Sequence, residues 1–303
     1  MLFRSDDERL DLESWRRLIE FMCGLGVDGI TILGVLGEAP KLSNEESAEF
    51  VKHVLKRVNG KVQIVVGVSS AGNQNLKNLT DTVMNLGAAG VMISPNAGLR
   101  TDEQIENYFG GLIKELGEQV PICLQDYPQL TAVHMSAPLI NRMITKFPSI
   151  VMLKAEDVPG LRKISKVREA EAKGQRRVSI LVGNSAMFLP QELARGADGA
   201  MTGVAYPEML VGVCKKFAAG DVEGANDLYD AFLPLVRYEN QPGIGLAIRK
   251  EILRRRGVIA SAKLRTPGAA LDADDHKDLT HLLERLERKI AQLAVPPSLR
   301  RAS

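Results

Sequence analysis

The chain has 303 residues, and its 39 lysines and arginines against 37 aspartates and glutamates give a formal net charge of +2. This length suits one large α/β domain or two small ones, and the balanced charge gives no reason to expect nucleic acid or an anionic membrane as a partner. No stretch reaches the roughly 18 consecutive apolar residues of a membrane helix, and no apolar signal segment follows Met1. Three widely spaced cysteines favour reduced thiols. These features predict a cytoplasmic protein.

Short β-branched apolar runs alternate with amphipathic segments along most of the chain. The predicted strands cover residues 30–33, 62–68, 91–93, 120–124, 150–153, 180–182 and 200–201. The predicted helices among them include residues 12–24, 44–57, 76–86, 103–116 and 137–147. Strands without polar alternation, separated by helices, indicate a parallel sheet covered on both faces.

A Gly-x-x-Gly-apolar motif begins at Gly26, Gly87 and Gly196. It is typical of a helix that ends on a left-handed glycine and turns tightly into a strand. The separations of 61 and 109 residues are close to two and four units of roughly 30 residues, the size of one β/α repeat. The spacing therefore predicts a (β/α)8 TIM barrel.

The start and the end of the chain depart from a plain barrel. Residues 1–11 are mostly charged, so we expect the first barrel strand to be missing or truncated, and the natural chain to include an upstream apolar strand. After Pro207 the pattern is helical, near residues 207–218, 222–236, 243–256 and 274–294. This length exceeds one closing helix. We therefore expect a barrel over residues 1–207, and the last barrel helix with a C-terminal helical extension over residues 208–303.

Lys154 closes the apolar run of residues 149–153. Burial disfavours the charged form of a lysine, and a neutral lysine attacks carbonyl carbons to form a Schiff base. The alternative is a structural lysine whose stem lies on apolar surface and whose head reaches water. Gln125 ends the preceding strand 29 residues earlier, one β/α unit away. Both residues are thus expected at the carboxyl end of the barrel, where active sites of this fold lie.

The segment after the second predicted barrel strand carries two glycines, Gly34 and Gly37. They allow the backbone N–H groups of Val35, Leu36 and Gly37 to converge on a carboxylate. Ser43 and Glu46 have the spacing of a capping box that opens the next helix.

Other cofactor chemistries lack their motifs. The histidines show no metal-ligand spacing, and the chain has no Cys/His cluster, dinucleotide-binding glycine loop or serine-hydrolase elbow. We expect no metal and no cofactor other than a covalent Schiff base through Lys154. The four histidines are His53, His134, His276 and His281.

Together these motifs resemble the dihydrodipicolinate synthase / N-acetylneuraminate lyase family. The segment from Gly34 to Glu38 stands where the family has Gly-Thr-Thr-Gly-Glu, and Gln125-Asp126-Tyr127-Pro128 stands where it has Tyr-Asn-Val-Pro. Lys154 matches its Schiff-base lysine. Residues 199–203 match its last barrel strand. The resemblance implies a TIM barrel, a 2-keto acid substrate and a homo-oligomer, by resemblance a tetramer.

The departures from the synthase pattern carry functional information. Leu36 and Gln125 replace a threonine and a tyrosine that relay protons in the synthase, and a leucine cannot move a proton. Leu130 replaces its substrate-binding arginine, and Asn96-Ala97 stands at its inter-subunit tyrosine. Gln125-Asp126, residues 199–203 and residues 237–241 resemble instead the 2-keto-3-deoxy-sugar-acid dehydratase branch.

The predicted function is therefore a lyase acting on a 2-keto-3-deoxy sugar acid, as a dehydratase or an aldolase. Gln125 is expected to hydrogen-bond a substrate hydroxyl or water. Substrate-binding residues are expected to be Val35, Leu36, Gly37, Asn184, Ser185, Thr202, Gly203 and Tyr206. The proton carrier stays open among a substrate carboxylate, a bound water and Tyr206. Two alternatives are a synthase-like condensation of pyruvate with an aldehyde and a non-catalytic 2-keto acid sensor.

Overall fold

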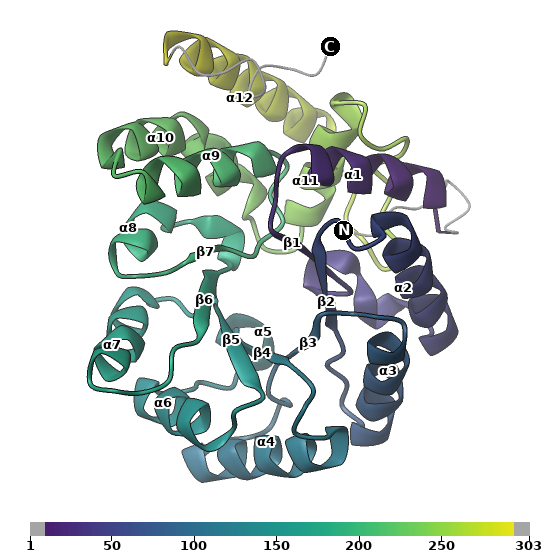
Figure 1. Ribbon diagram of the computed structural model, residues 1–303. Coiled ribbons are helices and arrows are strands. Elements are labelled where there is room, and N and C mark those ends of the chain that lie inside the picture. Colours follow the sequence, from purple (N-terminus) through teal and green to yellow (C-terminus); the bar gives the residue numbers. More distant parts are fainter. Residues whose placement is uncertain (1–9, 294–303) are drawn as a thin grey trace.

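A parallel sheet of seven strands forms the centre of the computed structural model, which describes residues 10–293. Neighbours along the chain are neighbours in the sheet, in the order β1 to β7, and every pair is parallel. The sheet curls into a barrel (Figure 1). The strands are β1 (Gly29–Ile32), β2 (Gln63–Gly67), β3 (Gly90–Ile93), β4 (Ile122–Asp126), β5 (Ile150–Ala155), β6 (Ser179–Val182) and β7 (Gly199–Ala200).

Helices surround the sheet as a ring (Figure 1). Those next to the strands are α1 (Leu12–Gly24), α2 (Asn44–Val58), α3 (Asn73–Asn85), α4 (Asp102–Leu116), α6 (Ala137–Lys146), α7 (Leu161–Ala172), α8 (Leu189–Ala194) and α9 (Pro207–Ala218). Short helical turns η1 (Val35–Gly37), η2 (Ala39–Lys41), α5 (Pro128–Thr131) and η3 (Asn184–Ala186) lie in the loops. The C-terminal extension follows as α10 (Val222–Glu239), α11 (Gly245–Arg255) and α12 (Ala273–Gln292). No helix in residues 10–293 is long and apolar enough to cross a membrane.

Local sequence signals account for many element boundaries. The three predicted helix-ending glycines are left-handed, with φ of +72° at Gly26, +96° at Gly87 and +93° at Gly196, a region that glycine adopts without steric cost. The predicted capping box is present, since Glu46 N donates to Ser43 Oγ and Ser43 N donates to Glu46 Oε2. All seven predicted strands are confirmed within a few residues.

The core lies between the sheet and the helix ring. All residues of β3 and β4 are buried, which explains why their sequences lack polar alternation. Phe50 of α2 and Phe109 of α4 are fully buried and press the helices onto the strands. This packing holds the strand ends, and the loops that follow them, in fixed positions.

The sheet in residues 10–293 contains seven strands, and no pairing joins β1 to β7. The loops after β1 and β7 nevertheless lie close together. A Cβ atom added to Gly203 would lie only 2.6 Å from Leu36 Cδ1. The expectation about the first strand concerns a part of the chain that lies mostly outside the described residues. The expected boundary between barrel and extension stays a prediction.

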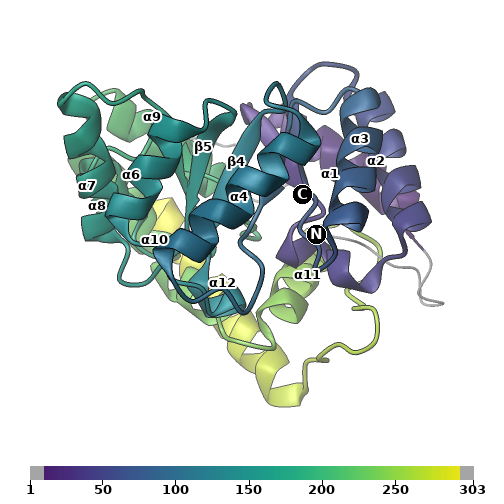
Figure 2. The same ribbon diagram turned by 90° about the horizontal axis from the view of Figure 1, so that it is seen from below.

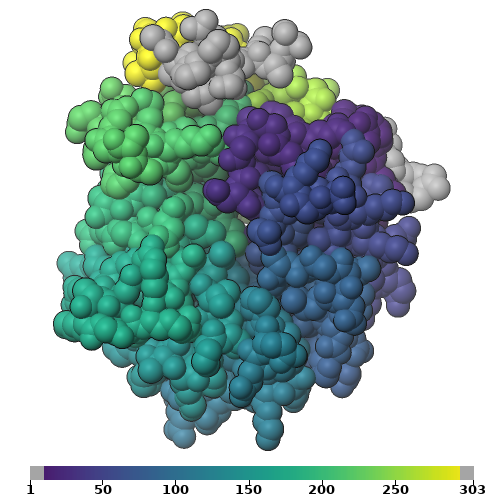
Figure 3. Space-filling view, in the orientation of Figure 1, coloured from purple at the N-terminus to yellow at the C-terminus, as the bar shows by residue number. Residues whose placement is uncertain are grey.

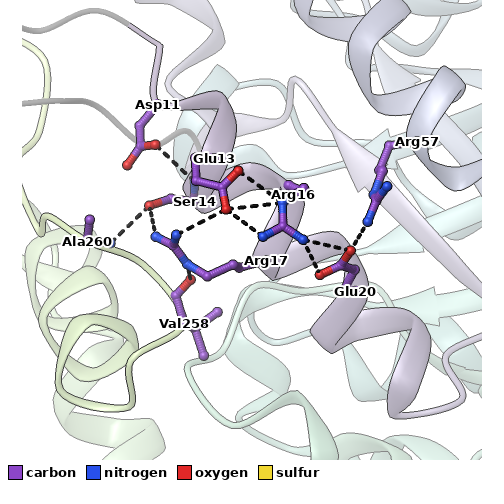
Figure 4. Close-up of polar contacts among 9 residues, drawn as sticks. All are labelled: Asp11, Glu13, Ser14, Arg16, Arg17, Glu20, Arg57, Val258 and Ala260. Carbon is purple, nitrogen blue, oxygen red and sulfur yellow. Dashed lines mark hydrogen bonds and ion pairs between the residues drawn. The ribbon is translucent and has the colours of Figure 1, made fainter.

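The extension packs on one end of the barrel. Figure 2 shows α11 and α12 together beyond one end of β4 and β5, and in Figure 3 the N-terminal α1 borders the C-terminal segments. Two hydrogen bonds join α1 to the chain after α11: Ala260 N donates to Ser14 Oγ at 2.9 Å, and Arg17 Nε donates to Val258 O at 3.4 Å (Figure 4). The extension is thus attached to the first described helix.

Candidate active site

Lys154 and Gln125 lie next to each other at the carboxyl ends of β5 and β4. They are partners in the strand register, so the sequence prediction of equivalent positions is confirmed. The Lys154 side chain is only 12% exposed. Its Nζ lies 3.1 Å from Glu156 Oε2, so the lysine head contacts a carboxylate rather than open water. The catalytic role of Lys154 stays a prediction.

Glu156 is a candidate site residue that the sequence reasoning missed. It is 6% exposed, and its Oε2 accepts a hydrogen bond from Gln125 Nε2 at 2.6 Å as well as contacting Lys154. The signal was available, because residues two apart on an extended strand point to the same face, which places Glu156 beside Lys154. A buried carboxylate in contact with an amine can accept a proton from it.

The backbone after β6 makes room for this carboxylate. A Cβ atom on Gly183 would lie 2.2 Å from Glu156 Oε1, so only glycine fits this close approach. The next residue donates its backbone N–H to Glu156 Oε1, with Asn184 N 3.2 Å away. The Glu156 carboxylate is therefore held by contacts from three neighbouring strand ends.

The turn η3 after β6 has a strained backbone. Three consecutive residues other than glycine adopt left-handed φ values, +46° at Asn184, +58° at Ser185 and +55° at Ala186. Such conformations persist only where surrounding contacts hold them. Here Ser185 N donates to Thr202 Oγ1 at 3.0 Å, and Ser185 Oγ donates to Asn240 Oδ1 at 2.7 Å. The structure thus brings together the predicted residues Asn184, Ser185 and Thr202.

A buried arginine from the extension completes the polar cluster at this turn. Arg249 of α11 is 4% exposed and donates through Nη2 to Ser185 Oγ. Its Nε lies 3.7 Å from Glu239 Oε1, too far for a good hydrogen bond. Burial raises the pKa of Glu239 to about 7, although Arg249 and the Ala205 N–H lower it. Burial likewise lowers the pKa of Arg249.

The turn η1 after β1 offers two unused backbone donors. Gly37 N donates to Gly34 O at 2.8 Å, so its N–H is engaged within the turn, and the binding role expected for Gly37 stays a prediction. Within residues 10–293, the N–H groups of Val35 and Leu36 have no hydrogen-bond partner, as is usual for the first residues of a helical turn. Leu36 contacts Gly203 across the turn. These two donors are the ones that fit a substrate carboxylate.

Two tyrosines differ in their relation to this site. The Tyr206 ring centroid lies 4.1 Å from the Arg256 guanidinium carbon and 5.5 Å from the Phe232 centroid, with the two rings tilted by 59°, so it belongs to the interface between barrel and extension. Tyr127 follows β4 and interacts electrostatically with Glu156 and Arg249. Burial and the Glu156 charge raise the pKa of Tyr127, and Arg249 lowers it. Tyr127 is thus a neighbour of the cluster that the sequence reasoning did not single out.

Comparison with known proteins agrees with this geometry. The sequence model of the dihydrodipicolinate synthetase family matches residues 3–286. The crystal structure of a dihydrodipicolinate synthase from Rhodopseudomonas palustris has a TM-score of 0.91 and 44% identity, covering 93% of this chain and 94% of that one. A parallel barrel with a largely buried lysine side chain at the end of β5 is consistent with this match. The chain belongs to the dihydrodipicolinate synthetase family.

Two curated relatives with different activities are also similar. An L-2-keto-3-deoxyarabonate dehydratase from Azospirillum brasilense is 30% identical over 295 residues, 96% of this chain and 93% of the relative. A 4-hydroxy-tetrahydrodipicolinate synthase from Methanocaldococcus jannaschii is 27% identical over 234 residues, 76% of this chain and 78% of the relative. The chain is thus a carbon–oxygen or carbon–carbon lyase of this family.

Proposed function

We propose that this lyase is a dehydratase that binds a 2-keto-3-deoxy sugar acid as a Schiff base on Lys154 and removes its C4 hydroxyl as water. The observation that carries the proposal is the contact of 3.1 Å between Lys154 Nζ and Glu156 Oε2. Glu156 is thus a proton acceptor in a site where Leu36 and Gln125 replace the threonine and tyrosine of the synthase. Similarity over nearly its full length to an L-2-keto-3-deoxyarabonate dehydratase supports the substrate class.

The chemistry begins with proton transfer from the Lys154 ammonium to Glu156. The free amine attacks C2 of the keto acid to give a carbinolamine. Protonated Glu156 then returns its proton to the C2 hydroxyl, which leaves as water, so that the carboxylate is regenerated and an iminium ion that acidifies the C3 protons is formed. A C3 proton then passes to Glu156, and the C4 hydroxyl leaves with that proton as water. Hydrolysis of the conjugated iminium returns the Lys154 amine and releases the product. Gln125 holds Glu156 in place through the hydrogen bond of 2.6 Å.

The remaining predicted residues have binding roles in this proposal. The Val35 and Leu36 N–H groups hold the C1 carboxylate. The residues that line the rest of the substrate are Asn184, Ser185, Thr202 and Gly203. The direct substrate contacts predicted for Gln125 and Tyr206 stay predictions, as does a cytoplasmic location.

The Schiff base is tested by borohydride reduction in the presence of pyruvate, followed by peptide mass spectrometry. We expect the reduced pyruvyl adduct on Lys154. A folded protein without an adduct on Lys154 would contradict the proposal. Repeating the measurement with a panel of 2-keto-3-deoxy acids tests turnover, because a dehydratase yields a deoxygenated semialdehyde whereas an aldolase yields pyruvate and an aldehyde.

The same panel separates two other functions. The similarity to the Rhodopseudomonas palustris protein favours a condensation of pyruvate with an aldehyde, although Leu36, Gln125 and Leu130 lack the groups that the synthase uses. Consumption of pyruvate with an added aldehyde would identify that activity. Tight binding of 2-keto acids without turnover would identify a sensor.

We further propose a homo-oligomer, and by family resemblance a tetramer. Four large apolar side chains are exposed on loops at the carboxyl end of the barrel, and a second copy would cover them. They are Val35 at 43%, Leu130 at 54%, Val158 at 45% and Phe188 at 42%. Light scattering after gel filtration measures the mass directly. A monomer at micromolar concentration, or an unchanged mass for Leu130→Glu, would contradict this arrangement.

A further inference from the structure

Two consecutive buried residues of helix α11, both with cationic side chains, contact two different loops of the barrel. Arg249 reaches the turn after β6 through Ser185. Lys250, with 0% exposure, reaches the turn after β1, where its Nζ donates to Glu38 Oε2 at 2.7 Å. The Lys250 Nζ also donates to Lys263 O at 2.9 Å. A completely buried lysine charge is costly unless it is paired and hydrogen-bonded, so this arrangement requires an explanation.

Glu38 directly follows the turn η1 and has a strained backbone. Its φ is +52°, a left-handed value that is unfavourable for a residue other than glycine. The side chain is 2% exposed and accepts from Lys250 Nζ, from Lys41 Nζ at 3.0 Å and from Arg265 N at 3.0 Å. Burial raises the pKa of Glu38, but its hydrogen bonds and charge contacts with Lys250 and Lys41 outweigh burial and hold it below the ordinary value.

The three donors come from different parts of the chain. Lys41 is local, whereas Lys250 and Arg265 belong to the extension, more than 200 residues away in sequence. Arg265 is itself fixed to the first turn of α2, since its Nη1 donates to Glu46 Oε2 at 2.7 Å. The extension therefore holds the left-handed residue that follows η1, two positions after the free N–H group of Leu36.

We propose that Lys250 is a positioning residue that, through Glu38, sets the η1 turn in the geometry that recognises the carboxylate of a 2-keto acid. This inference rests on the proposed binding of the C1 carboxylate by Val35 and Leu36. Lys250 does not touch the substrate. It fixes the strained backbone so that both N–H groups point to one place, and substrate binding is thereby coupled to docking of the extension.

The test compares pyruvate with methyl pyruvate, its uncharged methyl ester at C1, by borohydride trapping on Lys154. Lys250→Met removes the Nζ donor but keeps an unbranched side chain of similar length. We expect the half-saturating pyruvate concentration to rise about tenfold, the factor that corresponds to one charge-assisted hydrogen bond. The plateau of trapped protein and the half-saturating concentration of methyl pyruvate should stay at the wild-type values.

Glu251→Gln is the matched control. Glu251 is the next residue on α11, is 4% exposed and is paired with Arg254 and Arg255 rather than with a barrel loop. It should leave the trapping of both ligands unchanged. Glu38→Gln is the second variant, used if Lys250→Met does not fold, because the contacts from Lys41 and Arg265 remain; it should show the same selective loss for pyruvate.

The outcomes separate this inference from the proposed function. A wild-type protein without any Lys154 adduct contradicts both. A wild-type adduct combined with equal effects of Lys250→Met on pyruvate and methyl pyruvate, or with no effect on either, overturns the positioning role alone. An effect of Glu251→Gln as large as that of Lys250→Met also overturns it, since the loss would then reflect general destabilisation of α11.

Discussion

The two ends of the barrel differ in how they build left-handed turns. At the amino end, the turns before β1, β2, β3, β4, β6 and β7 each contain a left-handed glycine, for example Gly26 and Gly87. At the carboxyl end, the left-handed positions are mostly occupied by residues with side chains. Of the seven such residues in the described chain, six follow β1, β4 or β6, namely Leu33, Glu38, Ala132, Asn184, Ser185 and Ala186.

This difference has a functional reason. A left-handed glycine costs no strain but supplies no side chain. This suits the amino end of the barrel, which contributes to stability rather than to the active site. The carboxyl end keeps side chains at strained positions, where Glu38 and Ser185 contact Lys250 and Arg249. Observed strain of this kind supports a functional assignment.

The presence of a surface hollow does not by itself show which end of the barrel holds the active site. A hollow of about 410 Å³ lies at the amino end, between the end of α2 and the start of β2. Its lining includes Lys52, Lys56 and Gln63, which are all exposed. The candidate cluster of Lys154 and Glu156 lies at the other end. The proposed site therefore rests on side-chain contacts and backbone strain rather than on volume.

The largest predicted effect concerns the lysine itself. Lys154→Ala removes the nucleophile, and we expect kcat on the substrate found in the keto-acid panel to fall by about 10³-fold or more, as for loss of a covalent catalyst. Steady-state kinetics measures this. Lys166→Ala, an exposed lysine on α7, is the control. Turnover within tenfold of the wild type would remove the carboxyl end from consideration as the site.

The next effect concerns the proton acceptor. Glu156→Gln keeps the shape of the side chain but cannot accept a proton, so kcat should fall by roughly 10²- to 10⁴-fold. Borohydride trapping of pyruvate should still label Lys154 at long reaction times. Glu169→Gln, exposed on α7, should behave as the wild type. An unaffected kcat in Glu156→Gln would require another proton carrier, with Tyr127 the first to test.

The third effect is a pH dependence of stability that comes from the carboxyl end. Burial raises the pKa of Glu239 from its ordinary value of 4.5 to about 7 in the folded state. Between these two pH values the folded state binds more protons than the unfolded state. The free energy of unfolding therefore falls as pH rises through this window. Glu239→Gln cannot titrate, so its stability should fall less between pH 5 and pH 8.

Urea denaturation at pH 5, 6, 7 and 8 measures this dependence. Glu118→Gln, an exposed residue outside the cluster, serves as control and should follow the wild-type curve. Parallel curves for the wild type and Glu239→Gln would show that Glu239 titrates in the folded protein as it does in the unfolded one.

The smallest effect tests the two kinds of turn directly. Ala132 is exposed with φ of +56°, and Gly87 has φ of +96° with open space around a Cβ atom. Ala132→Gly should stabilise and Gly87→Ala should destabilise the protein, each by about 1 kcal/mol, because only glycine adopts these angles without strain. Thermal unfolding measures both. Changes of the same sign would show that backbone strain does not distinguish the two ends.

Much of the fold could be predicted because its signals are local. Apolar runs marked all seven strands, glycines marked the helix ends, and Ser43 and Glu46 marked a helix start. Lys154 was recognisable because a lysine in an apolar run is unusual. Glu156 was missed, although its spacing of two residues from Lys154 on an extended segment was sufficient to place both side chains on one face.

The sequence by itself determined the elements and their order and made Lys154 a candidate, since periodicity, turn residues and burial act over short stretches of chain. Only the tertiary structure decided which distant groups surround that lysine. Lys250 and Glu38 are separated by 212 positions yet form a buried pair, and Arg249 meets Ser185 across 64 positions. Such contacts follow from the packing of the extension on the barrel, and no local pattern in the sequence encodes them.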